Sequence, residues 1–199
     1  MAYLGTQPND VKKNTGLYTP SEILQLTKDG SWGGSLELIQ SQSVSGASTC
    51  NFTNIKENIY DVHLMQFTDV DQSGNFYAEL RLSNDSGSSF ETSNYQRAIQ
   101  YGGTQGSFGA NQSTSTDRFS ILGFSRGVSL YVYLYNLGNS SKFSFITHHA
   151  PPANIYMYFG GGVYTVAETI NAIQVLNSAG GSFTRGTVSL FGIKQIWVT

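Results

Sequence analysis

Charged side chains are scarce in this sequence. Asp, Glu, Lys and Arg together make up 12% of the residues, and the formal net charge is −2. The 11 Lys and Arg residues form no cluster that would replace the counterions along a phosphate backbone. We therefore expect no binding to nucleic acid.

Cysteine is almost absent, since Cys50 is the only one. A single cysteine cannot form a disulfide within the chain, so stability must come from the hydrophobic core, from partners, or from both. An isolated cysteine of this kind is usually a small buried apolar residue, which is what we expect of Cys50.

Long apolar runs are also missing. No stretch approaches the ~18 apolar residues of a membrane-spanning helix, so we expect no membrane insertion. The first residues, MAYLGTQPNDVKKN, contain no apolar stretch of the signal-peptide type. We therefore expect a soluble protein that is made in a cytoplasm.

Glycine and aromatic residues are plentiful, with 22 Gly, 12 Tyr and 12 Phe among 199 residues. This composition suits β-strands joined by turns and does not suit a helical bundle. From about residue 35 the apolar residues recur with a period of two, in roughly ten short segments separated by turn residues. The sequence predicts an all-β fold: an antiparallel two-sheet β-sandwich, jelly-roll-like, over residues 35–199.

Residues 1–34 follow a different pattern. Residues 1–18 show no period and predict an extended arm. In TPSEILQLTKDG, Thr19 can cap a helix, Pro20 suits its first position, and Glu22 can reach back to the cap, which predicts a short helix over residues 20–29. Such a helix is marginal alone in water, so it must dock on the same chain or on another protein.

Two connections in the sandwich have distinctive sequences. The turn DQSG predicts a hairpin between IYDVHLMQF and the strand NFYAELRLS, on which Phe76, Ala78, Leu80 and Leu82 share a face. Residues 102–118 contain almost nothing to bury, so we expect them to form a long surface loop.

Several patterns that can carry catalysis are incomplete. GFSRG matches the Gly-x-Ser-x-Gly pattern of serine hydrolases, but a strand pattern follows Ser125 where a helix is required. No acidic residue lies between Ser125 and the pair His148 and His149. Neighbouring side chains on a strand point to opposite faces, so these two histidines cannot ligate one metal together.

An acidic stretch, DVDQSGNFYAEL, spaces its carboxylates like a calcium loop but has Leu80 where a bidentate carboxylate is required. We expect no metal and no cofactor. If the DQSG hairpin closes tightly, Asp61 and His63 lie near Glu79 and Arg81. These four residues would share one face of the hairpin, with Leu64 and Leu80 on the other face. Two carboxylates there would be able to cleave a glycan, but a solvated ion-pair cluster is the simpler interpretation, and we expect no enzymatic activity.

Tyrosines alternate with aliphatic residues on two predicted strands, VSLYVYLYN and NIYMYFGGG. An ordinary sandwich strand has one solvated polar face and does not need a second aromatic one. The tyrosines are therefore expected to be covered by the chain's own loops, by a second copy of the chain, or by a glycan whose sugar rings stack on them. They are Tyr131, Tyr133, Tyr135, Tyr156 and Tyr158.

The C-terminal stretch TINAIQVLNSAGGSFTRGTVSLFGIK resembles the closing segment of a group of tailed-phage virion proteins that end in a jelly-roll module. IYDVHLMQFTDV and ELRLSNDSGSSF are similar to earlier hairpins of that module. LYTPSEILQLTKDGSWGGSLELI is similar to the leading segment of marine-phage examples. The resemblance covers most of the chain, and it supplies no catalytic residues.

This resemblance implies a structural protein of the virion, made in the host cytoplasm and tail-associated, of the tail-fibre or receptor-binding type. It implies a homotrimer, which we expect to form through the Tyr-rich sheet face. A host surface glycan is a further candidate partner. A head decoration or cement protein remains the alternative, and a glycan-binding or glycan-cleaving module is a third. Residues 1–34 would be the attachment segment to other virion proteins, with these anchors: Leu4, Ile23, Leu24, Leu26 and Trp32.

Overall fold

The computed structural model describes residues 19–28, 36–73, 76–124, 127–150, 156–177 and 180–194. Contacts divide the chain into two compact units, Met1–Gly34 and Ser35–Thr199. The first contains one described element, the helix α1 (Pro20–Lys28). The second contains all described strands.

The capping predicted for the helix is confirmed. The backbone amide of Thr19 donates to a carboxylate oxygen of Glu22 at 2.6 Å, and the amide of Glu22 donates to the hydroxyl of Thr19 at 3.3 Å. Each residue thus satisfies one of the amides that the first turn of a helix leaves without a partner.

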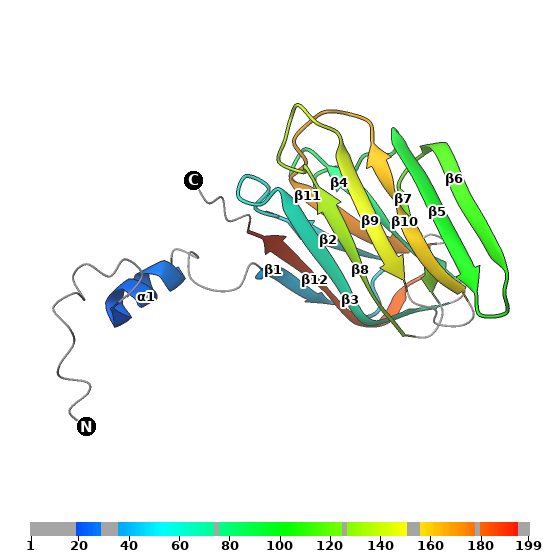
Figure 1. The fold of residues 1–199 in the computed structure, drawn as a ribbon, viewed down its shortest axis with the longest axis horizontal. Helices are drawn as coiled ribbons and strands as arrows, with labels where there is room; N and C mark the ends of the chain where they lie inside the picture. Colours follow the sequence, from blue (N-terminus) through cyan, green and yellow to red (C-terminus); the bar gives the residue numbers. More distant parts are fainter. Residues whose placement is uncertain are drawn as a thin grey trace, which may run out of the picture. The chain divides into compact units, whose positions relative to one another are not determined.

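Two antiparallel sheets form the second unit, which confirms the predicted β-sandwich (Figure 1). The large sheet has eight strands in the order β1-β12-β3-β8-β9-β10-β5-β6, and the small sheet has four in the order β2-β11-β4-β7. Their bounds are β1 (Leu36–Ser43), β2 (Thr49–Thr53), β3 (Val62–Gln72), β4 (Phe76–Ser83), β5 (Tyr95–Gly103), β6 (Phe108–Thr116), β7 (Phe119–Phe124), β8 (Val128–Tyr135), β9 (Ser144–Ala150), β10 (Tyr156–Tyr164), β11 (Ala172–Asn177) and β12 (Phe183–Ile193).

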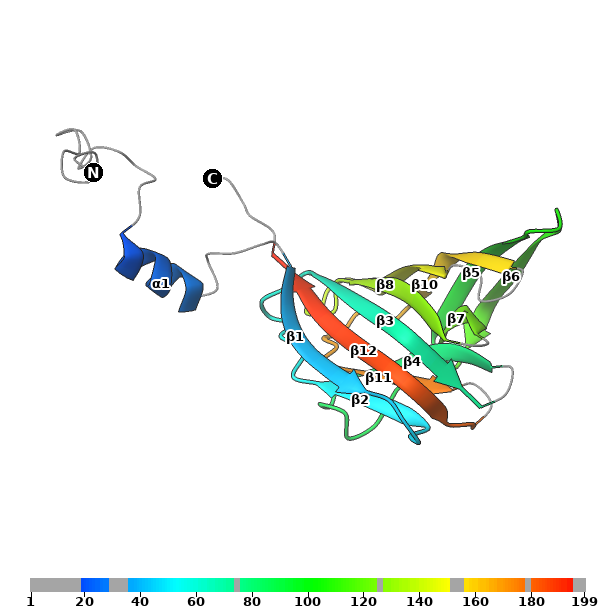
Figure 2. The same ribbon diagram turned by 90° about the horizontal axis from the view of Figure 1, so that it is seen from below.

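Eight of these strands have the connectivity of a jelly roll. Strands β1, β12, β3 and β8 pair in one sheet and β2, β11, β4 and β7 in the other, and the chain crosses between the sheets along most connections. Two further strand pairs, β5–β6 and β9–β10, are inserted into this pattern and extend the large sheet along one side. The β5–β6 hairpin projects beyond the rest of the sandwich (Figure 2).

The core lies between the sheets and is mostly apolar. One parity of β8, Val128 to Leu134, faces inward beside Met65 and Phe67 of β3. From the small sheet, Ala78, Leu80 and Leu82 of β4 are fully buried, as predicted.

The connection between β3 and β4 is not the hairpin that DQSG predicted. Strand β3 pairs with β12 and β8 in the large sheet, whereas β4 pairs with β11 and β7 in the small sheet. Turn residues specify a reversal of the chain but not whether the reversing strands pair, and here the chain changes sheets.

The expected loop at residues 102–118 is also wrong, because most of this stretch is the edge strand β6. None of its side chains is buried, so it lacks the apolar alternation that reveals a strand in sequence. It is held by its pairing with β5 along Gly102 to Tyr95.

The glycine triplet 160–162 does not interrupt the large sheet. These glycines lie inside β10 and pair with both β9 and β5.

A candidate interaction surface on the large sheet

The outer face of the large sheet, which points away from the small sheet, is formed by rows of paired residues that cross all or most of its strands. The central row reads Leu38, Phe191, Leu64, Tyr133, Thr147, Gly161, Ala98, Gln112 from β1 to β6. One flanking row reads, from β1 to β5, Leu36, Ile193, Val62, Tyr135, Phe145, Val163, Gln96. The other reads, from β1 to β6, Ser41, Ser189, Gln66, Tyr131, His149, Phe159, Gln100, Ala110.

These three rows contain no Asp, Glu, Lys or Arg, although much of their apolar surface is exposed. Leu38 is 54% exposed, Tyr131 42% and Phe159 43%. Contiguous apolar patches of this kind mark interaction surfaces, because isolated soluble proteins rarely expose them. Beyond the rows, at the end of β3 and β12, Arg185 pairs with Asp69 and Asp71. Arg97 of β5 also lines part of this face, but its guanidinium donates to Asn111 and Ser120.

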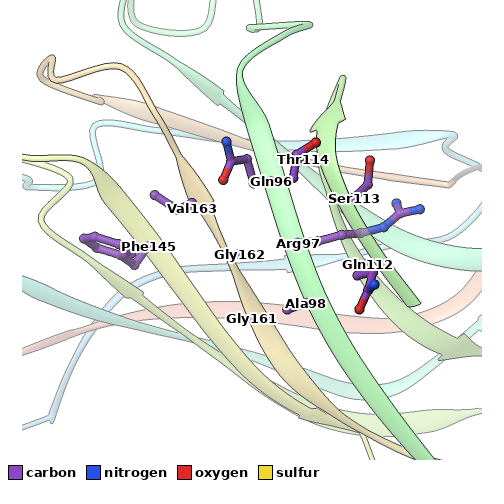
Figure 3. Close-up of a pocket in the computed structure, with 10 residues that line it drawn as sticks. All are labelled: Gln96, Arg97, Ala98, Gln112, Ser113, Thr114, Phe145, Gly161, Gly162 and Val163. Carbon is purple, nitrogen blue, oxygen red and sulfur yellow. The ribbon is translucent and has the colours of Figure 1, made fainter. Parts of the chain in front are cut away.

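The outer face carries large apolar side chains along one half and a groove along the other. Large side chains of β1, β12 and β3 form a raised strip that we call the ridge: Leu36, Leu38, Val62, Leu64, Phe191 and Ile193. Across the sheet, a groove of about 540 Å³ runs along β10 and β5 (Figure 3). Its floor contains Ala98, Gly161 and Val163, and Phe145 borders it on one side with Gln112 and Thr114 on the other.

A second hollow of about 320 Å³ lies between β3 and β8 on the same face. It is lined by Gln66, Ser129 and Tyr131, among others. The uncharged outer face therefore has relief that a complementary surface can fill.

The five tyrosines expected on one face lie on two. Tyr131, Tyr133 and Tyr135 point outward from β8, with the first two rings 5.7 Å apart. Tyr156 and Tyr158 of β10 instead have the parity of the buried Tyr164, so they point to the inner face. Strand β10 carries large apolar residues on both faces, so the parity within this strand does not reveal that Met157 and Phe159 are its outward residues.

Tyr156 and Tyr158 form their own cluster with Tyr101 on the inner side of β10 and β5. The ring of Tyr101 is 5.5 Å from that of Tyr156 and 5.7 Å from that of Tyr158. A Cβ on Gly109 would collide with the ring of Tyr101, so that ring lies over the glycine of the neighbouring strand.

An ion-pair network surrounds Glu79 on β4. Arg118 donates to one of its carboxylate oxygens at 2.9 Å, and the hydroxyl of Ser120 donates to the other at 3.2 Å. Burial raises the pKa of Glu79, whereas the charge of Arg118 opposes this change. Asp117 bridges Arg118 and Arg81, and its hydrogen bonds from Arg118 contribute most to lowering its pKa to about 2.

The pairing of Asp61 with Glu79 is not formed. Asp61 precedes β3 of the large sheet, whereas Glu79 lies on the small sheet, on the parity opposite the core residue Leu80. The predicted facing of β3 is wrong too, because His63 is buried in the core and Leu64 belongs to the outer face. The two carboxylates therefore do not form the arrangement that glycan cleavage requires.

The two adjacent histidines point to opposite faces, as predicted. His149 belongs to the outer face, with its ring 5.9 Å from that of Tyr131. His148 is buried and neither of its ring nitrogens has a hydrogen-bond partner. Burial lowers its pKa to about 4, and the nearby His149 contributes to this change.

Other predicted positions need only a brief account. Cys50 is buried as expected, and burial raises the pKa of its thiol to about 11. Leu24 is 55% exposed on α1. Leu4, Trp32, Ser125 and the side chains of Ile23 and Leu26 lie outside the described residues.

Two further findings concern the described part of the chain. Its His, Cys, Asp and Glu side chains form no group of three or more with the spacing of a metal site. Its helical segment has neither the length nor the apolar character needed to cross a membrane.

The residues that the sequence did not single out are the apolar ones beside the tyrosines. Leu38, Leu64, Phe145, Phe159 and Phe191 complete the outer face. The sequence contained a signal for these outward residues, because β3 and β12 have large apolar residues on both parities, as in Leu190 and Phe191.

Compared with known protein families and with curated proteins, the chain matches none.

Proposed function

We propose that this protein is a non-enzymatic structural protein that assembles with copies of itself through the outer face of its large sheet. The observation that carries the proposal is this face, which is broad, exposed and uncharged. Isolated soluble proteins rarely expose a contiguous apolar surface of this kind, which favours a partner that covers it.

The assembly fits the tailed-phage virion protein that the resemblance implies, with a tail-associated position. A virion part made in a cytoplasm completes its apolar burial by oligomerising and needs no disulfide. Residues 1–34 would attach it to other virion proteins.

Electron microscopy of purified particles of a phage that encodes the chain tests this function. We expect mass spectrometry to find the chain in the particle and the map to place it at the tail. Density on the capsid would support a decoration protein instead, and absence from the particle would contradict both.

Glycan binding is a second candidate function, and the inner cluster of Tyr101, Tyr156 and Tyr158 favours it. Half-buried aromatic rings laid over a sheet are platforms on which sugar rings stack. Titration with pyranose oligosaccharides of host surfaces tests it. Binding that Tyr156→Ala abolishes and Tyr131→Ala preserves would support this site, and no binding to any glycan would rule it out.

A further inference from the structure

We propose that the outer face binds the outer face of one second copy about a two-fold axis that runs parallel to the strands between β8 and β9. The ridge of each copy then sits in the groove of the other. This inference rests on the proposed self-association and adds its symmetry and the residues in contact.

The strand order makes the two halves of the face complementary. A two-fold axis at this position places β12 over β5, β3 over β10, and β1 over β6 of the second copy. In the central row, Phe191 then faces Ala98, Leu64 faces Gly161, and Leu38 faces Gln112. Each large side chain meets a small residue or the border of the groove.

The second hollow provides an independent match. The same axis places Phe159 of β10 over β3 of the second copy, opposite Gln66. Gln66 lines the 320 Å³ hollow between β3 and β8. The ring of Phe159, 43% exposed in one copy, is therefore positioned to fill a hollow that the ridge does not reach.

Another two-fold arrangement of the same faces fits less well. An axis in the plane of the sheet but perpendicular to the strands would keep the strand order and place β3 on β3. Leu64 and Phe191 would then meet the ridge of the second copy, while the two grooves would face each other across an empty space. Voids and overpacked contacts both lose stability relative to interdigitated side chains.

The size of the face suits one partner. Eight strands ~4.8 Å apart span about 38 Å, and three rows of side chains span about 20 Å, which gives roughly 750 Å² per copy. Stable interfaces bury about 800 Å² on each partner. The three rows also contain no charged side chain that would repel their own copy.

A charge-swap experiment tests the predicted register. Ala98→Arg and Phe191→Glu each place an unpaired charge in the interface, so each alone should raise the dissociation constant of the full-length protein at least about 30-fold. The double variant should regain most of the affinity, because the two charges face each other across the axis. Within one chain they lie five strands apart, about 24 Å, too far to pair.

The matched control combines Ala98→Arg with Tyr135→Glu, which has the same two charges but places the second opposite Phe145. This pair should not regain affinity. Circular dichroism checks that each variant folds, and sedimentation gives its mass.

If Phe191→Glu fails to fold, cross-linking provides the test. Leu38→Cys and Gln112→Cys together should yield covalent dimers with a bis-maleimide of about 10 Å, the spacing of facing sheets. Neither single variant should cross-link. Its dimer contains one introduced cysteine in each copy, and these two lie at opposite edges of the pair of sheets.

The outcomes separate this inference from the proposed function. Dimers with recovery in the double variant support both. A mass of three chains without recovery overturns the two-fold pairing and leaves self-association standing, with the trimer that the resemblance implies. A wild-type protein of one chain overturns both.

Discussion

At the scale of single residues, His148 is the least compensated polar group in the described core. It is 4% exposed and neither ring nitrogen is hydrogen-bonded. An imidazole in this position folds in its neutral form, because burial disfavours the charged form. Its titration therefore links folding to pH.

We expect acid to destabilise the protein through His148. The pKa of this residue falls from 6.5 to about 4 on folding, so the unfolded chain binds the extra proton between these values. The contribution of His148 to the free energy of unfolding is fully present above pH 6.5. It decreases by about 3 kcal/mol as the pH falls toward 4, because each pKa unit corresponds to ~1.4 kcal/mol. Urea unfolding at pH 7 and pH 4 should show a smaller loss for His148→Leu than for the wild type. An equal loss in both would contradict this role.

Glu79 and Arg118 provide a second prediction. Arg118→Met leaves a buried carboxylate without its guanidinium partner, which should lower the unfolding free energy at pH 7 by roughly 3–5 kcal/mol. Because burial already raises the pKa of Glu79, protonation in acid should reduce this deficit.

Two variants control for the loss of an arginine. Arg185→Met breaks exposed ion pairs, which water already screens, so its loss of unfolding free energy should be much smaller than that of Arg118→Met. The double variant Glu79→Gln with Arg118→Met should recover much of the loss. Equal losses of unfolding free energy in Arg118→Met and Arg185→Met would show that the burial of the charge on Glu79 does not affect stability.

At the scale of the strands, the sequence predicted correctly those that have one apolar and one polar face. It did not predict the strand, or its inward side, where both faces are alike. β4 was predicted correctly because Ala78, Leu80 and Leu82 alternate with polar residues. β3 has apolar residues on both faces, so its inward side was assigned wrongly. β6 has polar residues on both faces, and its strand character comes from pairing with β5, which no local pattern reveals.

The edge strand β6 should be less protected than the central strands of the large sheet. Its side chains bury nothing fully, whereas alternate residues of β8 lie in the core. Local opening of β6 therefore costs little apolar burial. Amide hydrogen exchange followed by mass spectrometry should be faster in residues 108–116 than in residues 128–135. Equal protection would contradict the view that β6 opens without loss of core burial.

At the scale of the whole molecule, the composition predicted the fold class, and the aromatic strands predicted that a sheet face needs cover. Sequence did not give the identity of that face. The inserted pairs β5–β6 and β9–β10 bring Ala98 and Gly161 into one row with Leu64 and Phe191, and this row depends on long-range pairing. The ridge, the groove and their complementarity exist only in the assembled sheet.

The mass of the purified protein in solution tests the central claim most directly. Sedimentation equilibrium at micromolar concentration should give at least twice the 21.7 kDa of one chain. Tyr131→Lys, which places a charge on the outer face, should shift the folded protein toward one chain. A wild-type mass of 21.7 kDa would show that the exposed face of the large sheet does not drive self-association.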